Sequence, residues 1–233
     1  MDKTLAVHQP NYLPWLGYFH KIASADIFVF LDSVQFPRGQ SVANRNKIKT
    51  SQGWQWLTVP ISIPSGRKGK ATYLEVALAN DTWRKKHLKT IQMNYSRAPY
   101  FQPHFDYISK ILLENHSFAQ TNINLIRYFL EQLEIETPLY RLSELKDISG
   151  KNNELIINLC HALGADTYLS GLGALKYNNP ANYQQSHIHL EYQNFTSPQY
   201  PQQFGEFIPN LSIVDLLFNC GPESKEILLG DQK

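Results

Sequence analysis

The chain alternates between two patterns of hydrophobic and polar positions, one typical of buried strands and one typical of amphipathic helices. Residues 4–8 and 27–31 are short, nearly continuous apolar runs, and residues 13–23 between them place apolar side chains at helical spacing. A strand buried on both faces of a parallel sheet gives such a run, and a helix is the usual crossover between two parallel strands. This part of the chain therefore predicts a strand, a helix and a strand joined as a βαβ unit.

The pattern becomes more helical toward the middle of the chain. Strands are expected at 54–61 and 72–79, on either side of a basic, glycine-containing loop. Asp81 is a suitable N-cap residue, and the spacing of apolar side chains after it is helical. Helices are expected at about 81–95, 100–114 and 121–133. Together they predict a helical cap.

Strands and helices alternate again in the last hundred residues. Strands are expected at 139–142, 167–170 and 188–192, and helices at 153–163, 213–218 and 223–229. No internal repeat or low-complexity linker divides the sequence. We therefore expect a single α/β domain over residues 1–233, with three layers, a mainly parallel Rossmann-like sheet and a helical cap at about 81–133.

The composition is that of a globular protein. Hydrophobic residues make up 42% and charged residues 18% of the 233 residues, so apolar burial can offset the entropy of ordering the chain. Cys160 and Cys220 are expected to be reduced thiols, because two cysteines do not make a disulfide framework. The N-terminal apolar run is too short for a signal peptide, and no stretch approaches the ~20 apolar residues of a membrane span. We expect a cytoplasmic protein without integral membrane association.

Positive charge is concentrated in one part of the chain. The net charge is only +2, but residues 38–97 contain 12 of the 22 basic residues and 2 of the 20 acidic ones. Such a segment attracts anions, which favours a phosphate-bearing partner: a nucleotide, a sugar nucleotide or a nucleic acid. The alternative is a solvated face whose charge the acidic remainder balances.

Polar side chains follow the first two predicted strands, at the edge where an open α/β sheet binds its ligands. His8 ends the first strand and Asp32 follows the second. Imidazole titrates near neutral pH and a carboxylate can fix its tautomer, so we interpret the pair as a general base and its orienting group. The alternative is a histidine that caps its own loop and an aspartate that begins a turn. The neighbouring substrate-binding candidates are Gln9, Asn11, Tyr12 and Gln35.

A second group of candidates follows the strand that ends at Ser170. Ser170, Gly171 and Gly173 precede an expected helix, where glycines let backbone N–H groups approach an anion. The same glycines are as often ordinary turn residues. His187 and His189 share one face of a strand, but no nearby cysteine or pair of carboxylates completes a ligand set, so no metal site is expected.

Basic and amide side chains after the second strand are the remaining candidates. Asn44, Arg45 and Lys47 combine fixed donors with positive charge, which suits a phosphate. We expect Arg38, Arg45 and Lys47 to face the same cleft as His8. A second basic cluster lies on several faces of one helix and is expected to be largely solvated. Its members are Arg84, Lys85, Lys86 and Lys89.

Several motifs together resemble the WbqC-like protein family. The long block VHQPNYLPWLGYFHKI at residues 7–22 carries most of the resemblance, and RNKIKT, GWQWLTVP, YLSGLGALKY and PNLSIVDLLFNCG continue it over nearly the whole chain. The resemblance implies a cytoplasmic protein of bacterial surface-polysaccharide gene clusters, such as those for O-antigen. Enzymes that make or decorate nucleotide-linked amino sugars are often encoded there. The family supplies no proven catalytic set.

A remoter likeness is to the HIGH-type nucleotidylyltransferases, which include pantothenate synthetase. Those enzymes also run from strand to loop to helix to an apolar strand near an LQF-like tripeptide, and the matching stretch is ASADIFVFLDSVQF at residues 23–36. By that alignment their HxGH signature falls on residues 14–17, which read PWLG, so its phosphate-binding histidines are absent. This departure argues against nucleotidyl transfer by that route.

Two functions of different classes are consistent with these features. The first is a transferase that acts on a nucleotide-activated or amino sugar, one version being acyl or aminoacyl transfer to a sugar amine with His8 as the base. The second is a non-catalytic protein that binds a nucleotide or an RNA strand on its basic face, with Trp54 and Trp56 as stacking side chains. The sequence indicates no particular cofactor.

Overall fold

The computed structural model describes residues 3–37, 39, 41–64, 70–114 and 116–230. A five-stranded sheet of order β7-β2-β1-β8-β9 lies in the described chain, and every neighbouring pair of its strands is parallel. Its strands are β1 (Thr4–His8), β2 (Ile27–Phe30), β7 (Leu139–Arg141), β8 (Thr167–Ser170) and β9 (His189–Tyr192). The expected parallel α/β sheet is confirmed.

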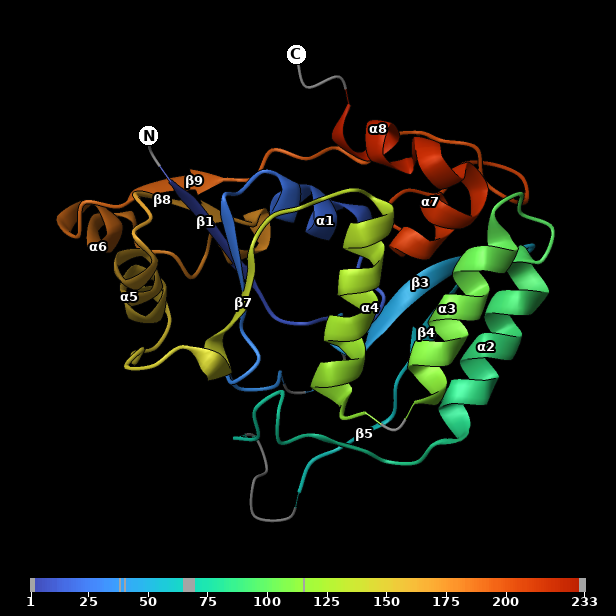
Figure 1. Cartoon of the computed structure of the whole chain (residues 1–233), viewed down its shortest axis with the longest axis horizontal. Coiled ribbons are helices and arrows are strands. Elements are labelled where there is room, and N and C mark those ends of the chain that lie inside the picture. Colours follow the sequence, from blue (N-terminus) through green and yellow to red (C-terminus); the bar gives the residue numbers. More distant parts are fainter. Residues whose placement is uncertain (1–2, 38, 40, 65–69, 115, 231–233) are drawn as a thin grey trace.

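Helices cover both faces of this sheet, as an all-parallel sheet requires. Leu5 and Val7 of β1 pack in one core with α5 and α6, while Ala6 packs in another core with α1 and α4. Figure 1 shows α5 and α6 on one side of the strands and α1 and α4 on the other. The covering helices are α1 (Leu16–Ala23), α4 (Phe118–Gln132), α5 (Asn153–Leu163) and α6 (Pro180–Gln185). This arrangement is the three-layer, Rossmann-like fold that the sequence predicts.

A second group of elements lies beyond α1 and α4 (Figure 1). It contains the antiparallel ribbon β3 (Arg45–Thr50) and β4 (Gly53–Thr58), the short pair β5 (Ile61–Ser62) and β6 (Ala77–Leu78), and helices α2 (Thr82–Tyr95), α3 (Phe101–Leu113), α7 (Ile213–Cys220) and α8 (Ser224–Leu229). Single-turn 3₁₀ helices follow β7, β8 and α7: η1 (Leu142–Glu144), η2 (Leu172–Ala174) and η3 (Gly221–Glu223). No helix in the described part of the chain is long and apolar enough to cross a membrane.

A buried polar network joins three of these outer elements. The Tyr95 hydroxyl of α2 donates to the Asp215 carboxylate of α7 at 2.7 Å and accepts from the backbone N–H of Lys49 in β3 at 2.8 Å. Tyr200 donates to the second oxygen of Asp215 at 2.9 Å. Asp215 is fully buried, and burial raises its pKa while the two tyrosine hydroxyls lower it. A buried carboxylate needs such donors, so the network fixes β3 against α2 and α7.

One strand was not expected and two local expectations are wrong, each for an identifiable reason. The sequence gives no apolar signal for β3, because its residues are RNKIKT and only Ile48 among them is apolar. Residues 72–79 form a turn followed by the two-residue β6 rather than a full strand. After Ser170 the chain forms the single-turn helix η2, which is too short to present a helix dipole.

Arg84 is also not solvated as expected. It is 5% exposed, and its guanidinium donates to the carbonyl of Glu114 at 3.0 Å and to that of Leu112. These carbonyls lie at the C-terminal end of α3, where the last C=O groups have no partner within the helix. Arg84 therefore caps a neighbouring helix, whereas Lys85, Lys86 and Lys89 are exposed as expected.

Gly221 is predicted to be far less tolerant of substitution than Gly205. Both have a left-handed backbone, with φ of 51° and 50°, but a Cβ at Gly221 would overlap the Tyr100 ring, whereas a Cβ at Gly205 would meet nothing within 4 Å. Gly205→Ala should lose about 1 kcal/mol of unfolding free energy from backbone strain, and Gly221→Ala about 2–4 kcal/mol because overpacking adds to it. Urea unfolding of the two variants measures the difference, and equal losses would contradict the packing argument.

Candidate functional site

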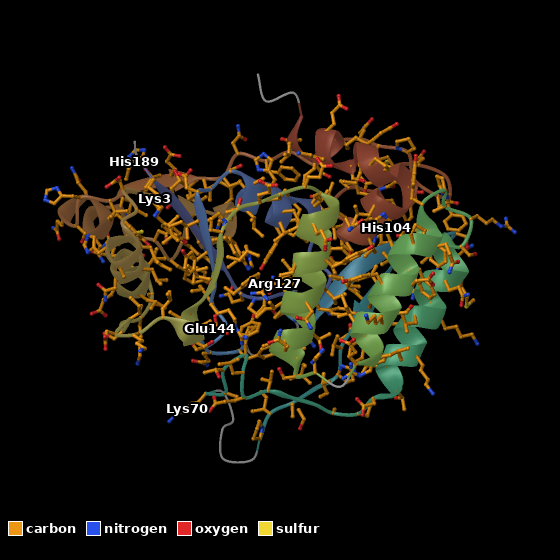
Figure 2. The ribbon with its side chains drawn as sticks, in the orientation of Figure 1. Lys3, Lys70, His104, Arg127, Glu144 and His189 are labelled. Carbon is orange, nitrogen blue, oxygen red and sulfur yellow. The ribbon has the colours of Figure 1, made fainter. Side chains whose placement is uncertain are left out.

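A cavity of about 680 Å³ opens at the carboxyl edge of the parallel sheet, the edge where open α/β folds bind their ligands. In Figure 2, Lys3 just before β1 marks the opposite edge of the sheet, and Glu144 just after β7 marks this one. Small-molecule sites usually have volumes of about 300–1,000 Å³. The cavity is therefore of a size that suits a nucleotide or a sugar.

Apolar side chains line one part of the cavity and polar side chains line the other. Leu31, Leu142 and Ile156 belong to the apolar part. No carboxylate is among the described lining residues, and Lys151 is their one charged side chain. The lining therefore favours a neutral or anionic ligand. Its amide and hydroxyl groups come from Gln9, Ser33, Gln35, Asn152, Asn153, Tyr177 and Asn178.

The cavity lies where the order of the strands reverses. From β1 the chain moves through β2 to β7 on one side, and later through β8 to β9 on the other. β1 and β8 pair only as far as Ala6 and Leu169, after which His8 pairs with β2 and Ser170 with β9. In open α/β sheets this reversal leaves a crevice that binds ligands.

His8 ends β1 beside the cavity-lining Gln9, with its ring centre 4.8 Å from that of Tyr18 in α1. Its Nδ1 is 3.1 Å from the Gln9 carbonyl oxygen. A carbonyl only accepts, so in the neutral ring Nδ1 carries the proton and Nε2 is an acceptor. Burial, assisted by the positive charge of Lys21, lowers the His8 pKa to about 4. The imidazole is therefore uncharged at neutral pH.

Asp32 does not orient His8. The carboxylate is fully buried and accepts from Arg141 Nε at 2.8 Å, from Ser143 Oγ at 2.7 Å and from the Ser143 backbone N–H at 3.0 Å. These bonds join the end of β2 to the end of β7. The backbone carbonyl of Gln9 takes the orienting position that the sequence analysis gave to Asp32, so the expected His8–Asp32 pair is corrected.

The first turn of α5 forms an anion-compatible corner of the cavity. Its N-cap residue, Asn152, has φ 51°, and no side chain caps the turn. Uncapped N–H groups at a helix start carry a partial positive charge. A Cβ on Gly150 would lie 2.9 Å from Cγ of Glu154 and 3.0 Å from the Leu155 nitrogen, so the glycine lets the loop pack closely against the acidic side chain and the backbone of this first turn. Lys151 lies in the same loop and also lines the cavity.

Ser170 connects to the cavity through one side chain. Asn178, which lines the cavity, donates to Ser170 Oγ at 2.9 Å and to the Tyr192 hydroxyl at 3.3 Å. Ser170 itself is fully buried. Gly171 and Gly173 are not among the described lining residues, and nothing lies within 4 Å of where their Cβ atoms would be.

Asn11 and Tyr12 are placed away from the cavity lining. Asn11 is 7% exposed, and Tyr12 is fully buried with its hydroxyl 3.0 Å from Nδ1 of His87 in α2. Burial raises the pKa of Tyr12 and lowers that of His87 to about 4. These contacts fix the loop after β1 against α2, and of the four loop candidates Gln9 and Gln35 line the cavity.

The basic candidates after β2 lie on the β3–β4 ribbon rather than in the cavity lining. The Arg45 guanidinium is 4.3 Å from the centre of the Trp56 ring, and Lys47 Nζ is 5.0 Å from that of Trp54. The Asn44 side chain donates to the Val59 carbonyl at 2.8 Å. The expectation that Arg45 and Lys47 share the cleft of His8 is therefore wrong, and Arg38 lies outside the described residues.

Comparison with known proteins assigns the chain to a family. The family model described as "WbqC-like protein family" matches residues 9–227. The chain belongs to this family. A relative of this WbqC-like protein among the curated proteins is the "Uncharacterized protein Rv1507c" of Mycobacterium tuberculosis, which is 34% identical over 229 residues that cover 97% of each chain. No solved structure matches this WbqC-like protein.

Sequence reasoning missed the residues that give the cavity its charge and part of its amides. Gly150 and Lys151 directly before the predicted helix at 153–163 are the signal that could have indicated them. Asn178 gives no such signal, because only the fold brings it to Ser170. Among the described residues of this WbqC-like protein, no three His, Cys, Asp or Glu side chains are grouped so that they could hold a metal ion.

Asp32→Ala is predicted to destabilise the protein by about 3 kcal/mol, because the partly buried Arg141 loses its short ion pair and keeps only the longer contact with the exposed Glu144 as an ion pair among the described residues. Arg141→Met and the double variant complete a double-mutant cycle, in which the double variant should lose much less than the sum of the two single losses. Urea unfolding measures all three. Additive losses, or a loss below about 1 kcal/mol for Asp32→Ala, would show that the pair does not hold β2 to β7.

The stability of the protein is predicted to fall as the pH falls from 6.5 to 4. The His8 pKa is about 4 in the folded chain and 6.5 in the unfolded chain, so the unfolded chain binds more protons in this window. Between pH 7 and pH 5, His8 should account for about 1.5–2 kcal/mol of lost unfolding free energy. Urea unfolding at pH 7 and pH 5 should show that His8→Gln loses about 1.5–2 kcal/mol less unfolding free energy than the wild type over this interval. An unchanged pH dependence would contradict the burial of a neutral His8.

Proposed function

We propose that this WbqC-like protein is a transferase of bacterial surface-polysaccharide biosynthesis, such as that of O-antigen, and that it acts on a nucleotide-activated or amino sugar. The reaction takes place in the cytoplasm, as the family resemblance implies. The cavity at the switch point of the sheet carries the proposal. It combines an uncharged amide surface with one anion-compatible corner, which are the two kinds of contact that a sugar nucleotide needs.

The corner at the start of α5 suits the phosphates of the ligand. Lys151 supplies positive charge, and the uncapped first turn of α5 supplies backbone donors beside Gly150. Phosphate binds at helix N-termini for these two reasons together. Glu154 lies in the same first turn but is not among the described lining residues, so Lys151 is their charged side chain.

The amide side chains suit the sugar or the base. Gln9, Gln35 and Asn178 line the cavity from three different connections, which follow β1, β2 and β8. Each amide offers both a donor and an acceptor, which matches the hydroxyl and amide groups of an amino sugar. The apolar wall with Leu31 and Leu142 can contact the less polar face of a ring.

Acyl or aminoacyl transfer to a sugar amine is the reaction that we favour for this site. The amine nitrogen attacks the acyl carbon of an activated ester or thioester donor, the bond from that carbon to the alkoxide or thiolate leaving group breaks, and the nitrogen loses a proton to a base. His8 Nε2, uncharged and with no hydrogen-bond partner in the described chain, is the acceptor next to the cavity-lining Gln9. A base with a pKa near 4 is weak at neutral pH, so a second group nearer to neutrality would improve the transfer.

Lys151→Met is predicted to weaken the binding of UDP-N-acetylglucosamine by about 1 kcal/mol, or about fivefold, because an exposed lysine loses one ion pair with phosphate. The matched control is Lys85→Met on α2, which is exposed and away from the cavity. Isothermal calorimetry at fixed ionic strength measures both. Equal weakening in the two variants would mean that the general field of the protein, and not the α5 corner, holds the phosphates.

A second candidate function rests on the β3–β4 ribbon. Arg45, Lys47, Trp54 and Trp56 interleave cations with indole rings, and Trp54 is 48% exposed. Residues 41–62 contain no aspartate or glutamate. Alternating cations and aromatic rings are the means by which proteins bind single-stranded nucleic acid without sequence preference. The alternative is therefore a protein that docks an RNA strand on this ribbon.

Binding to oligouridylate separates the two functions. An RNA-binding ribbon predicts an affinity that falls steeply with salt and that drops in Lys47→Met, while Lys151→Met has no effect. The transferase predicts that Lys151→Met weakens the binding of UDP-N-acetylglucosamine and that Lys47→Met has no effect on it. Tryptophan fluorescence follows the first titration and calorimetry the second.

A further inference from the structure

Lys21 is a buried amine at the switch point that the roles proposed above do not use. It lies on α1 and is 4% exposed, and its Nζ donates to the Val7 carbonyl at 2.9 Å. No carboxylate in the described chain pairs with it. A lysine ammonium has three N–H donors, so in its charged form two of them have no acceptor among the described residues.

Lys21 donates to the Val7 carbonyl, which lies where β1 and β8 diverge and no longer pair with each other. The His8 carbonyl accepts from Leu31 after β2. Backbone groups of successive residues in a strand point to opposite neighbours, so the Val7 carbonyl points toward β8. Pairing of β1 with β8 has already ended at Ala6. The Lys21 side chain therefore occupies the position of the next rung in the crevice between β1 and β8.

The amine also lies close to His8, so two groups that can carry positive charge share one buried space. The charge of Lys21 lowers the pKa of His8, and burial alone lowers the pKa of Lys21 to about 7. A methionine would fill a similar volume without the cost of burying an unpaired ammonium, which is several kcal/mol. A residue that weakens the fold at a ligand edge indicates a function there.

We propose that Lys21 is the proton-exchanging group of this site: its amine is uncharged in the empty protein and takes up a proton when a phosphate-bearing ligand occupies the cavity. The identity of the ligand rests on the proposed function, whereas the uncharged amine does not. A bound anion supplies the negative charge that the described surroundings of Lys21 lack.

The titratable groups that face Lys21 from the packed elements are His8 on β1 and Tyr168 on β8, whose ring centre is 6.0 Å from Nζ. On α1 itself, Tyr18 contacts the His8 ring and His20 lies one residue away. Burial raises the pKa of Tyr168 to about 12, and His8 is neutral above about pH 4. Between pH 6 and pH 9, therefore, Lys21 is the member of this group that titrates.

The first experiment measures the titration of Lys21 in the unliganded full chain. In protein labelled with ¹³C at lysine Cε, one resonance should shift with a midpoint near pH 7, well below the ordinary range of a lysine ammonium in water. The resonance is assigned by its absence in Lys21→Arg and in Lys21→Met, with Lys85→Met as the control. A midpoint above pH 9 for Lys21 would overturn the proposal. The wild-type titration stands even if one variant does not fold.

The second experiment measures proton uptake when UDP is added at pH 8. Calorimetry in HEPES and in Tris, which differ in ionisation enthalpy, gives the number of protons bound with the ligand. Wild-type protein should take up nearly one proton, and both Lys85→Met and Lys151→Met should keep most of this uptake per ligand bound. Lys21→Met should take up close to none. Binding of UDP without any uptake in the wild type would overturn the coupling.

The two experiments separate the two proposals. If UDP and UDP-N-acetylglucosamine do not bind but Lys21 titrates near pH 7, the proposed ligand class is wrong and the uncharged amine stands. The proton-uptake measurement is then repeated with pyrophosphate. If no proton is taken up with pyrophosphate either, the proposed link to phosphate is overturned. If the nucleotides bind but Lys21 titrates above pH 9, the proposed function stands and the role of Lys21 is overturned.

Discussion

β1 pairs with β2 on one side and with β8 on the other, but over different lengths. This difference determines much of the structure. The middle residues of β1, Leu5, Ala6 and Val7, are at most 4% exposed, so the strand is covered on both faces and bonded at both edges. Its pairing with β8 ends at Ala6, while its pairing with β2 continues to His8. Because the crossovers leave in opposite directions, the crevice forms at this point and nowhere else along the strand.

Polar groups that are buried near this edge hold the walls of the cavity in place. Asp32 and Arg141 join the ends of β2 and β7, and Asn178 joins the connection after β8 to Ser170. Each group has its partners at hydrogen-bond distance, as buried polar atoms require. Lys21 differs from them, because it has one acceptor for three donors and no opposite charge in the described chain. The contrast separates side chains that build the edge from one that can respond to what occupies it.

The fold could be predicted from the sequence where the burial of an element gives its hydrophobic residues a clear pattern. The strand at 4–8 and the helix at 153–163 are found with the same bounds in the structure, because one has a continuous apolar centre and the other is amphipathic. β3 could not be predicted, because its stability comes from the Tyr95–Asp215 network and from pairing with β4, which are contacts between distant residues. Strand-end reasoning indicated His8, Gln9 and Gln35; Gln9 and Gln35 line the cavity and His8 lies next to Gln9, while their binding of a ligand stays a prediction. Lys151 comes from the loop before α5, which strand-end reasoning does not reach.

The dense positive charge of residues 38–97 shows why charge along a sequence does not locate a site. Arg84 caps α3, and Lys49 is buried with its Nζ on Gln202 at 3.0 Å, so both serve the fold. Arg45 and Lys47 lie over indole rings on the ribbon. The charged side chain of the described cavity lining is Lys151, and the buried amine on the Val7 carbonyl is Lys21; both lie outside that segment. The described lining has no carboxylate and few cations. One added proton therefore changes the electrostatic potential in the cavity strongly, since charges interact more strongly in a partly buried space than in water. A neutral amine is therefore better suited to this cavity than a permanent cation, because it adds charge only when the ligand brings the compensating one.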